Sequence, residues 1–286
     1  MSEKFLIIGL GFLGNTIFQQ VTKFSIKPFG THKSDLDICN IESIEKKIDK
    51  IKPDCIINCA ALTNLDQIES NPKNAYAINA YGAKNLAIVS LKKKIKLIHI
   101  STDSVFDGKI GSYKEEDLPN PINKYAKSKK MGEDLVKEIS EKHVIVRTNF
   151  YGNNQDGKFL FNWIMKNLQQ KIPITGFHDV IFNPLEIENL SSMIIELVHS
   201  NFFGTIHLSS NQPMSKYEFA TTIARKLNYD TDLVRKGSIK EANFIAQRPL
   251  NTSLSNLLAR KILKTLPLSL EDWLDTKFDK SAFSIT

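Results

Sequence analysis

Lys4-Phe-Leu-Ile-Ile8 is followed directly by Gly9-Leu-Gly11-Phe-Leu-Gly14, and a helical pattern continues from Thr16 to Lys23. The apolar run predicts a strand, so the three glycines form a turn between a first strand and a first helix. Glycine lets the backbone turn tightly and approach a pyrophosphate, whose charge is then met by amides at the helix N-terminus. This arrangement predicts a dinucleotide site, with an ordinary glycine-rich turn as the alternative.

Four further strands are predicted in the first half of the chain, and a helical stretch separates each strand from the next. They cover residues 25–30, 55–60, 95–101 and 143–148. Strands that alternate with helices in this way indicate an α/β fold with a doubly wound parallel sheet of the Rossmann type.

The segment from Gly152 to Gly157 interrupts this alternation and predicts a boundary. We expect a dinucleotide-binding domain over 1–149 and a smaller mixed α/β substrate-binding lobe over 150–286, interleaved with elements that return to the sheet. The patterns in the second half predict helices over 159–170 and 190–199 and from Ser215, a strand over 205–208, and a loop region over 173–184.

The composition is that of an ordinary globular protein. The chain has 286 residues, of which 42% are hydrophobic and 24% charged. No apolar run approaches the roughly 18 to 20 residues that span a bilayer. The apolar run from Phe5 to Leu13 is short, contains two glycines and lacks a cleavage pattern, so a secretory signal is not expected. A cytoplasmic location without membrane association is the default expectation.

Charge, histidines and cysteines give little sign of nucleic acid, metal or disulfides. The net charge of +7 comes mostly from scattered lysines, which favour a solvated surface over a nucleic-acid site. The six histidines form no motif for metal binding. Cys55 and Cys59 share one predicted strand and are therefore about 13 Å apart. This exceeds the reach of a disulfide, roughly 7 Å between α carbons.

The pair Tyr125 and Lys129 indicates acid chemistry. Residues four apart share a helix face, and a lysine cation beside a tyrosine favours the phenolate, so the phenol would exchange its proton nearer neutral pH. Thr102 follows the apolar run 95–100, which places its hydroxyl at a carboxyl-terminal strand edge, where ligands bind. Together the three residues predict carbonyl reduction. For the pair alone, a chance spacing on a solvated helix is the alternative.

The residues after the second predicted strand favour NADPH as the cofactor. An acidic side chain at that place hydrogen-bonds the 2'-hydroxyl of NAD, whereas a base accommodates the 2'-phosphate of NADP. The chain has Thr31, His32 and Lys33 there, which offer donors to a phosphate. NADH stays open as an alternative because Asp35 is close by.

An ordered series of motifs extends over nearly the whole chain, and with it the chain resembles the dTDP-4-dehydrorhamnose reductase family of the extended short-chain dehydrogenase/reductase superfamily. The segments that carry the resemblance are 58–61 with Thr63 and Asp66, 75–86, 101–108, 113–117, 119–129, Gly132-Glu133, 204–209, 215–219 and 247–249.

This resemblance implies a role for individual residues. The implied catalytic residues are Thr102, Tyr125 and Lys129; Tyr125 would protonate the substrate oxygen and Lys129 would also bind the nicotinamide ribose. The implied cofactor residues are Gly9, Gly11, Phe12, Leu13 and Gly14 at the pyrophosphate, Asp37 and Ile38 at the adenine, and Ala60, Ala61 and Thr63 along the cleft. The substrate residues are Ser104, Val105, Phe106, Asn149, Phe150 and Arg248.

Some of these residues have a structural alternative. Asp37 is placed to cap a helix that begins at Ile41, and the two alanines allow one backbone to approach another. Arg248 precedes Pro249, which favours an extended backbone. Its guanidinium would grip a diphosphate in bidentate fashion, with a surface position or a bridge between the lobes as the alternative.

The resemblance also has departures. One residue separates Gly9 from Gly11, where the family usually has two. Ser104 stands where the family usually has tyrosine, and the segment 147–152 is one residue short and lacks the usual tryptophan. The last two sites face the sugar in the family, so these departures concern the substrate more than the reaction.

The reaction expected from this resemblance is NADPH-dependent reduction of the C4 keto group of a nucleotide-linked 4-keto-6-deoxyhexose, first of all dTDP-4-dehydro-L-rhamnose to dTDP-L-rhamnose. The alternatives are the reduction, epimerisation or dehydration of another nucleotide sugar, and a regulatory subunit like the non-catalytic partner of methionine adenosyltransferase. A homodimer is one candidate assembly. The nucleotide, the sugar stereochemistry and any metal at a subunit interface are left open.

Overall fold

Strand β1 (Lys4–Ile8) is an internal strand of a sheet that is covered on both faces, which explains why the four residues after Lys4 are all apolar. Phe5 and Ile7 point into one core cluster, with helices α1 (Phe12–Val21) and α8 (Ile187–His199). Leu6 and Ile8 point into a second cluster, with α2 (Ile41–Ile51), α5 (Ala83–Lys93) and α6 (Lys124–Ile139). The computed structural model describes all residues except 1, 25, 140–141, 154–158 and 279–286.

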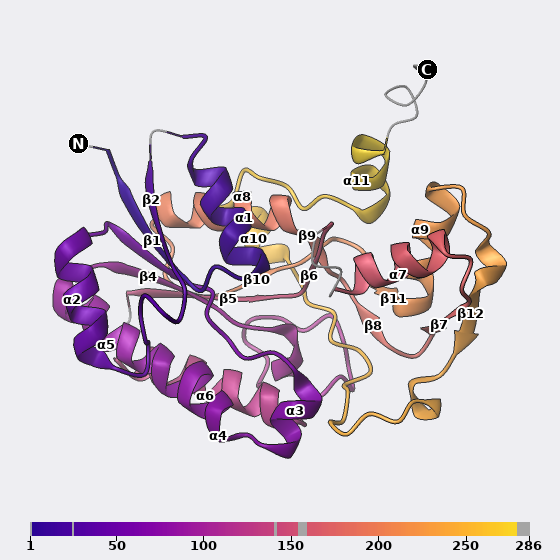
Figure 1. The fold of residues 1–286 in the computed structure, drawn as a ribbon, viewed down its shortest axis with the longest axis horizontal. Helices are drawn as coiled ribbons and strands as arrows, with labels where there is room; N and C mark the ends of the chain where they lie inside the picture. The colour runs from indigo at the N-terminus through magenta and orange to yellow at the C-terminus, as the bar shows by residue number, and fades with distance from the viewer. Residues whose placement is uncertain (1, 25, 140–141, 154–158, 279–286) are drawn as a thin grey trace.

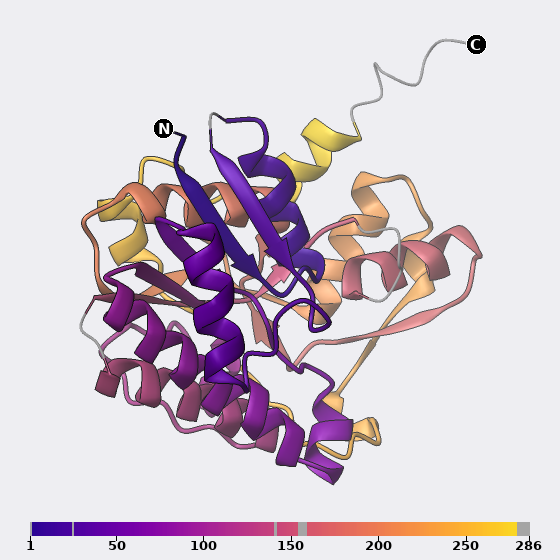
Figure 2. The ribbon, with the colours of Figure 1, turned by 60° about the vertical axis from the view of Figure 1, so that its left-hand side comes forward.

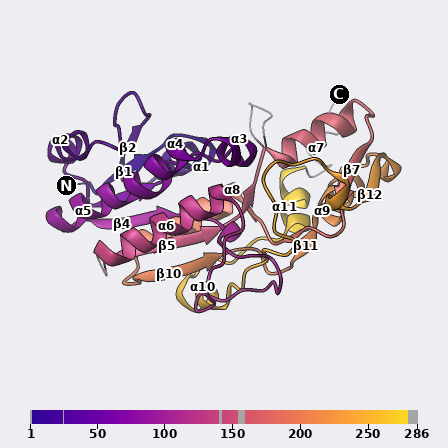
Figure 3. The ribbon, with the colours of Figure 1, turned by 90° about the horizontal axis from the view of Figure 1, so that it is seen from below.

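The central sheet has six strands, all parallel, in the order β10-β5-β4-β3-β1-β2 (Figure 1). The expected doubly wound α/β fold is therefore confirmed. The other strands are β2 (Lys27–Thr31), β3 (Cys55–Asn58), β4 (Lys96–Ile100), β5 (His143–Thr148) and β10 (Gly204–Leu208). Helices lie above and below this sheet, with α5 and α6 on the side opposite α10 (Leu257–Ile262) (Figure 3).

The chain leaves β1 toward one edge of the sheet to form β2 and then crosses to the other side to form β3. A crevice at such a reversal, outside the carboxyl ends of the strands, is the ordinary ligand site of an open parallel sheet. Gly9 stands at this point with a φ of +87°, and its amide donates to the Thr31 carbonyl at 3.1 Å. A Cβ on Gly9 would lie 2.6 Å from the Ala60 backbone, so only glycine fits.

A smaller lobe lies beside the carboxyl ends of the strands (Figure 2). Its core contains Tyr151, Phe161, Phe219 and Trp273, which make edge contacts with one another. The lobe is built from α7 (Leu160–Gln169), α9 (Lys216–Lys226), α11 (Leu270–Lys277), β7 (Ile174–Phe177), β8 (Ile181–Phe182), β11 (Met214–Ser215) and β12 (Val234–Gly237).

The loop region expected over 173–184 is wrong, because it contains β7 and β8. These strands pair with β12 and β11, which lie far away in the sequence. The strand expected over 205–208 is present as β10 and belongs to the central sheet, next to β5. The expected boundary at 152–157 lies mostly outside the described residues.

Short elements complete the chain. They are α3 (Leu65–Ser70), α4 (Lys73–Ala75), the π-helix η1 (Tyr76–Gly82), the 3₁₀ turns η2 (Asp103–Val105), η3 (Thr231–Leu233) and η4 (Ile239–Glu241), and the strand pair β6 (Phe150–Tyr151) and β9 (Leu185–Glu186). The three cysteines are free. Among the described helices, none combines the length and apolarity that a membrane crossing needs.

Candidate active site

Helix α6 and the end of β4 bring the three predicted catalytic residues together. The side chain of Asn123 accepts from the Ala126 amide at 2.8 Å and so fixes the start of α6 just before Tyr125. The Tyr125 hydroxyl is hydrogen-bonded to the side chain of Thr102. One turn later, the buried Lys129 donates from Nζ to the Ile100 carbonyl at 2.6 Å.

The protonation of this group differs from the expectation. Burial raises the pKa of Tyr125 to about 12, partly offset by the contact with the Thr102 side chain. Burial also lowers the pKa of Lys129 to about 8, against the stabilising charge of Glu133. The expectation that Lys129 brings the tyrosine pKa toward neutrality is wrong here, because burial of the phenol dominates its pKa. The phenol is instead kept protonated, as a proton donor must be.

The carboxylate of Asp103 is the centre of a hydrogen-bond network that the sequence did not reveal. It is buried and accepts from Thr102 Oγ1 at 3.1 Å, Ser104 Oγ at 3.2 Å, Asn149 Nδ2 at 2.9 Å and Thr252 Oγ1 at 2.7 Å. The network therefore ties the end of β4 to the end of β5 and to the C-terminal lobe. It fixes the orientation of Thr102 and Ser104 at the site.

A cavity of about 480 Å³ lies at the crevice between β1 and β3. It is lined by nine of the predicted cofactor residues: Gly9, Gly11, Thr31, His32, Lys33, Asp37, Ile38, Ala60 and Ala61. The Thr31 hydroxyl is buried there and has no hydrogen-bond partner among the described residues. Because a buried hydroxyl without a partner is costly, this atom fits a polar ligand in the cavity. The residues present suit a dinucleotide.

Other predicted cofactor residues lie elsewhere. The Leu13 side chain is in the core, so only its backbone faces the turn. Gly14 packs against the Gly9 carbonyl, where a Cβ would come within 2.1 Å of the oxygen. Phe12 packs on Phe159, with ring centroids 4.8 Å apart. Thr63 lines an adjoining cavity of about 410 Å³, which shares Ala61 with the cofactor cavity.

The alternative role of Asp37 as a helix cap is wrong. The side chain of Asn40 caps α2 by accepting from the Ser43 amide at 3.1 Å. Asp37 accepts from the Cys39 amide at 2.9 Å and lines the cofactor cavity.

A second cavity of about 660 Å³, here called the substrate cavity, lies between the sheet and the lobe. Of the predicted substrate residues, Ser104, Asn149 and Arg248 line it. It also has lining residues that the sequence did not reveal: Trp163, Phe177, Phe244 and Lys216.

The three remaining predicted substrate residues, Val105, Phe106 and Phe150, do not line this cavity. The 3₁₀ turn after Thr102 directs Val105 and Phe106 inward, where Phe106 stacks on Tyr113 with ring centroids 4.1 Å apart. Phe150 packs beside Phe12 against the core and does not line the substrate cavity. These residues follow Ser104 and Asn149 in the sequence, but their side chains do not reach the cavity.

The guanidinium of Arg248 lines the substrate cavity, and one of its buried nitrogens makes no hydrogen bond within the described residues. Nη2 donates to Asp66 Oδ1 at 3.1 Å, and the group lies over the Phe244 ring, 4.8 Å from its centroid. Nη1 is buried and has no partner in the described part of the chain. The bridge between the lobes, which was the alternative for Arg248, is present through Asp66 of α3, and a donor also remains for a ligand.

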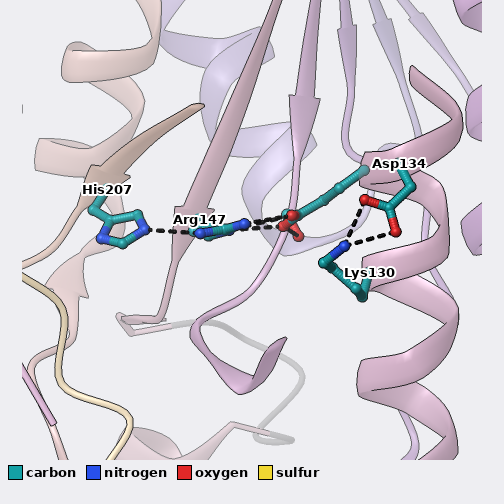
Figure 4. A network of polar contacts seen from close by, with 6 residues as sticks. Lys130, Asp134, Arg147 and His207 are labelled. Carbon is teal, nitrogen blue, oxygen red and sulfur yellow. Dashed lines mark hydrogen bonds and ion pairs between the residues drawn. The ribbon is translucent and has the colours of Figure 1, made fainter. Parts of the chain in front are cut away.

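A buried ionic network supports the helix that carries Tyr125 and Lys129 (Figure 4). Arg147 on β5 donates to Glu133 on α6 from Nε at 3.0 Å and from Nη2 at 2.8 Å. The Arg147 Nη1 lies 3.3 Å from Nε2 of His207, whose Nδ1 lies 3.0 Å from the Tyr113 carbonyl. Glu133 also accepts from Ser101 Oγ at 2.6 Å. The network thus connects α6 with β4, β5 and β10.

The parallel sheet, the glycine turn at the cofactor cavity and the Tyr125–Lys129 pair together define an oxidoreductase of the extended short-chain dehydrogenase/reductase superfamily. A family model described as the RmlD substrate binding domain matches residues 3–279. The chain belongs to this family, that of the dTDP-4-dehydrorhamnose reductases.

Three relatives illustrate the range of this similarity. The chain is 33% identical to dTDP-4-dehydrorhamnose reductase of Aggregatibacter actinomycetemcomitans, over 84% of each chain. It is 28% identical to methionine adenosyltransferase 2 subunit beta of Rattus norvegicus, over 88% of this chain and 80% of the relative. The crystal structure of dTDP-4-dehydrorhamnose reductase from Bacillus anthracis in complex with NADP superposes with a TM-score of 0.90 at 34% identity, covering 97% of this chain and 99% of the other.

Proposed function

We propose that this protein reduces the C4 keto group of a nucleotide-linked 4-keto-6-deoxyhexose with NADPH, specifically dTDP-4-dehydro-L-rhamnose to dTDP-L-rhamnose. The broader activity, an NADP-dependent reduction of a keto group on a nucleotide sugar, is that of the family. The observation that carries the proposal is the meeting of Thr102, Tyr125 and Lys129 at the end of β4, next to the Ser104 and Asn149 side chains of the substrate cavity.

Each of the three catalytic residues has a distinct role in the proposed reduction. Thr102, fixed by Asp103, orients the keto oxygen, and Tyr125 transfers its phenolic proton to that oxygen. Bound NADPH supplies the hydride that reduces the C4 carbon, which balances the proton from Tyr125. Lys129 would hold the nicotinamide ribose of the bound cofactor, and the phenolate that Tyr125 becomes takes a proton back from solvent. Domain 1–149 holds the cofactor and region 150–286 contributes most of the substrate cavity.

We expect catalytic efficiency with NADPH to exceed that with NADH. Lys33 and His32 line the cofactor cavity beside the Thr31 hydroxyl, which has no partner in the described part of the chain, whereas Asp35 accepts from the His32 amide at 3.0 Å. Lys33→Ala should reduce the preference by about tenfold, since a charge-assisted hydrogen bond to the 2'-phosphate is lost. Kinetics with both cofactors test this, with the exposed Lys23→Ala as the control. Equal catalytic efficiency of the wild type with NADPH and NADH would contradict this expectation.

Arg248→Lys is expected to raise the Michaelis constant for the nucleotide sugar by roughly tenfold or more, because lysine does not reproduce a bidentate grip on a diphosphate. The affinity for NADPH and the melting temperature should stay close to those of the wild type. The Arg248–Asp66 pair is partly exposed, at 20% and 34%, and such pairs contribute at most about 1 kcal/mol. A large fall in melting temperature with unchanged substrate affinity would instead assign Arg248 to holding the lobes together.

The substrate is tested by NADPH oxidation with a panel of dTDP-, UDP-, GDP- and CDP-linked 4-keto-6-deoxy sugars. The proposal expects the highest kcat/KM with dTDP-4-dehydro-L-rhamnose. Faster reduction of another nucleotide sugar would keep the reaction and correct the substrate. Binding of NADPH without turnover on any member would favour a non-catalytic role, for which the next experiment is a pull-down of a methionine adenosyltransferase.

A further inference from the structure

Lys216 begins helix α9 and reaches the substrate cavity from the lobe. Its backbone is fixed on both sides. Ser215 and Glu218 form a capping box, with the Glu218 amide 3.1 Å from Ser215 Oγ and the Ser215 amide 2.7 Å from Glu218 Oε2. The Lys216 amide donates to the Val180 carbonyl at 2.9 Å. The Lys216 side chain therefore projects from a rigid part of the backbone.

The amine of Lys216 lies over an aromatic ring, and the structure gives it no hydrogen bond or ion pair among the described residues. Nζ is 3.1 Å from the centroid of the buried Phe182 ring. The charged group that acts on it is Asp103, whose oxygens already accept from Thr102, Ser104, Asn149 and Thr252. Burial lowers the pKa of Lys216 to about 7, because the Asp103 charge offsets only part of the desolvation.

Two cationic side chains thus line one cavity, each with donors that are not used within the described chain. They are the ammonium of Lys216 and Nη1 of Arg248. A nucleotide sugar carries one group that is permanently dianionic, the diphosphate, and two cations match its charge. Ammonium and guanidinium groups both form strong charge-assisted hydrogen bonds to phosphate oxygens.

We propose that Lys216 and Arg248 together hold the diphosphate of the nucleotide sugar, so that Lys216 sets the affinity for the nucleotide part. The inference rests on the proposed function for its substrate class. Lys216 binds in its charged form, since only the ammonium contributes both the charge and three donors. Formation of the complex therefore includes uptake of a proton at neutral pH.

The test measures binding without turnover, so it stays decisive if the proposed reduction fails. Calorimetry compares dTDP and the unreactive dTDP-glucose on the wild type and on Lys216→Met, Lys216→Arg and the control Lys236→Met, which changes an exposed lysine on β12. We expect Lys216→Met to weaken both ligands by about tenfold or more. Lys216→Arg should keep most of the affinity, Lys236→Met should match the wild type, and NADPH affinity should be unchanged throughout.

A second readout is the pH dependence of dTDP-glucose binding, because its diphosphate does not titrate near neutrality. For the wild type the affinity should fall about tenfold between roughly pH 6 and pH 8, as an amine with a pKa of about 7 loses its proton. Lys216→Arg should remove this fall while Asp103 and Arg248, the other charged groups of the substrate cavity, stay in place.

Three results would overturn the inference. Unchanged dTDP affinity in Lys216→Met, with a loss only for dTDP-glucose, would place the amine at the sugar. Equal binding of both ligands by the wild type and Lys216→Met would leave Lys216 a packing role on Phe182. No binding of dTDP, UDP, GDP or CDP to the wild type would exclude a diphosphate site.

Discussion

Tyr125→Phe is expected to lower kcat roughly a hundredfold to ten-thousandfold, because the substitution removes the positioned proton donor. The ring still packs, so NADPH affinity should remain close to that of the wild type. The hydroxyl is hydrogen-bonded to Thr102, and its raised pKa keeps the proton available at neutral pH. Steady-state kinetics and NADPH titration of the purified variant separate the two effects.

The matched control for this substitution is Tyr81→Phe. Tyr81 is half exposed on η1, and removal of its hydroxyl should leave kcat within about twofold of the wild type. Retention of most activity by Tyr125→Phe would contradict the assigned role. A loss of NADPH affinity equal to the loss of rate would instead indicate a damaged cofactor site.

Arg147→Met is expected to lower the free energy of unfolding by about 3 to 5 kcal/mol, since it leaves the carboxylate of Glu133 buried without its partner. Both side chains are almost inaccessible, at 1% for Arg147 and 0% for Glu133. Denaturant unfolding measures the change. Because α6 carries Tyr125 and Lys129, activity should decline together with stability.

Two further variants serve as comparisons in the denaturant unfolding experiment. Arg225→Met breaks an arginine–glutamate pair at the surface, with Glu271 at 2.8 Å, and should cost at most about 1 kcal/mol. The double variant Glu133→Gln, Arg147→Met should recover part of the stability, because neither side chain of the pair then carries a buried charge without its partner. If Arg147→Met were no worse than Arg225→Met, the buried network would not support the site.

The sheet domain was predictable because its signals are local. Strands β1, β3, β4 and β5 each contain a short apolar run, and the turn after Ile8 needs the positive φ that glycine adopts at Gly9. The strands of the lobe were not predictable in the same way. β8 has two residues and β7 four, and each is stabilised by a partner strand that lies far along the chain.

The site was predicted where motif and position agree, as at Thr102, Tyr125 and Arg248. It was not predicted where the direction of a side chain decides the outcome. Val105 and Phe106 follow Thr102 but turn into the core, whereas Lys216, in a segment that resembles the family, faces the substrate cavity. The pKa of Tyr125 depends on its burial and on the neighbouring Thr102 and Asp103, and the spacing between Tyr125 and Lys129 predicts neither.

The most direct test of the proposed reaction is the transfer of deuterium from NADPH, labelled at the nicotinamide C4, to dTDP-4-dehydro-L-rhamnose. Mass spectrometry and NMR of the product locate the label. We expect dTDP-L-rhamnose with one deuterium at the sugar C4 for each NADPH oxidised, and almost none with Tyr125→Phe. A wild-type protein that binds labelled NADPH and yet delivers no deuterium to C4 of this or any other nucleotide-linked 4-keto sugar would contradict the proposed reduction.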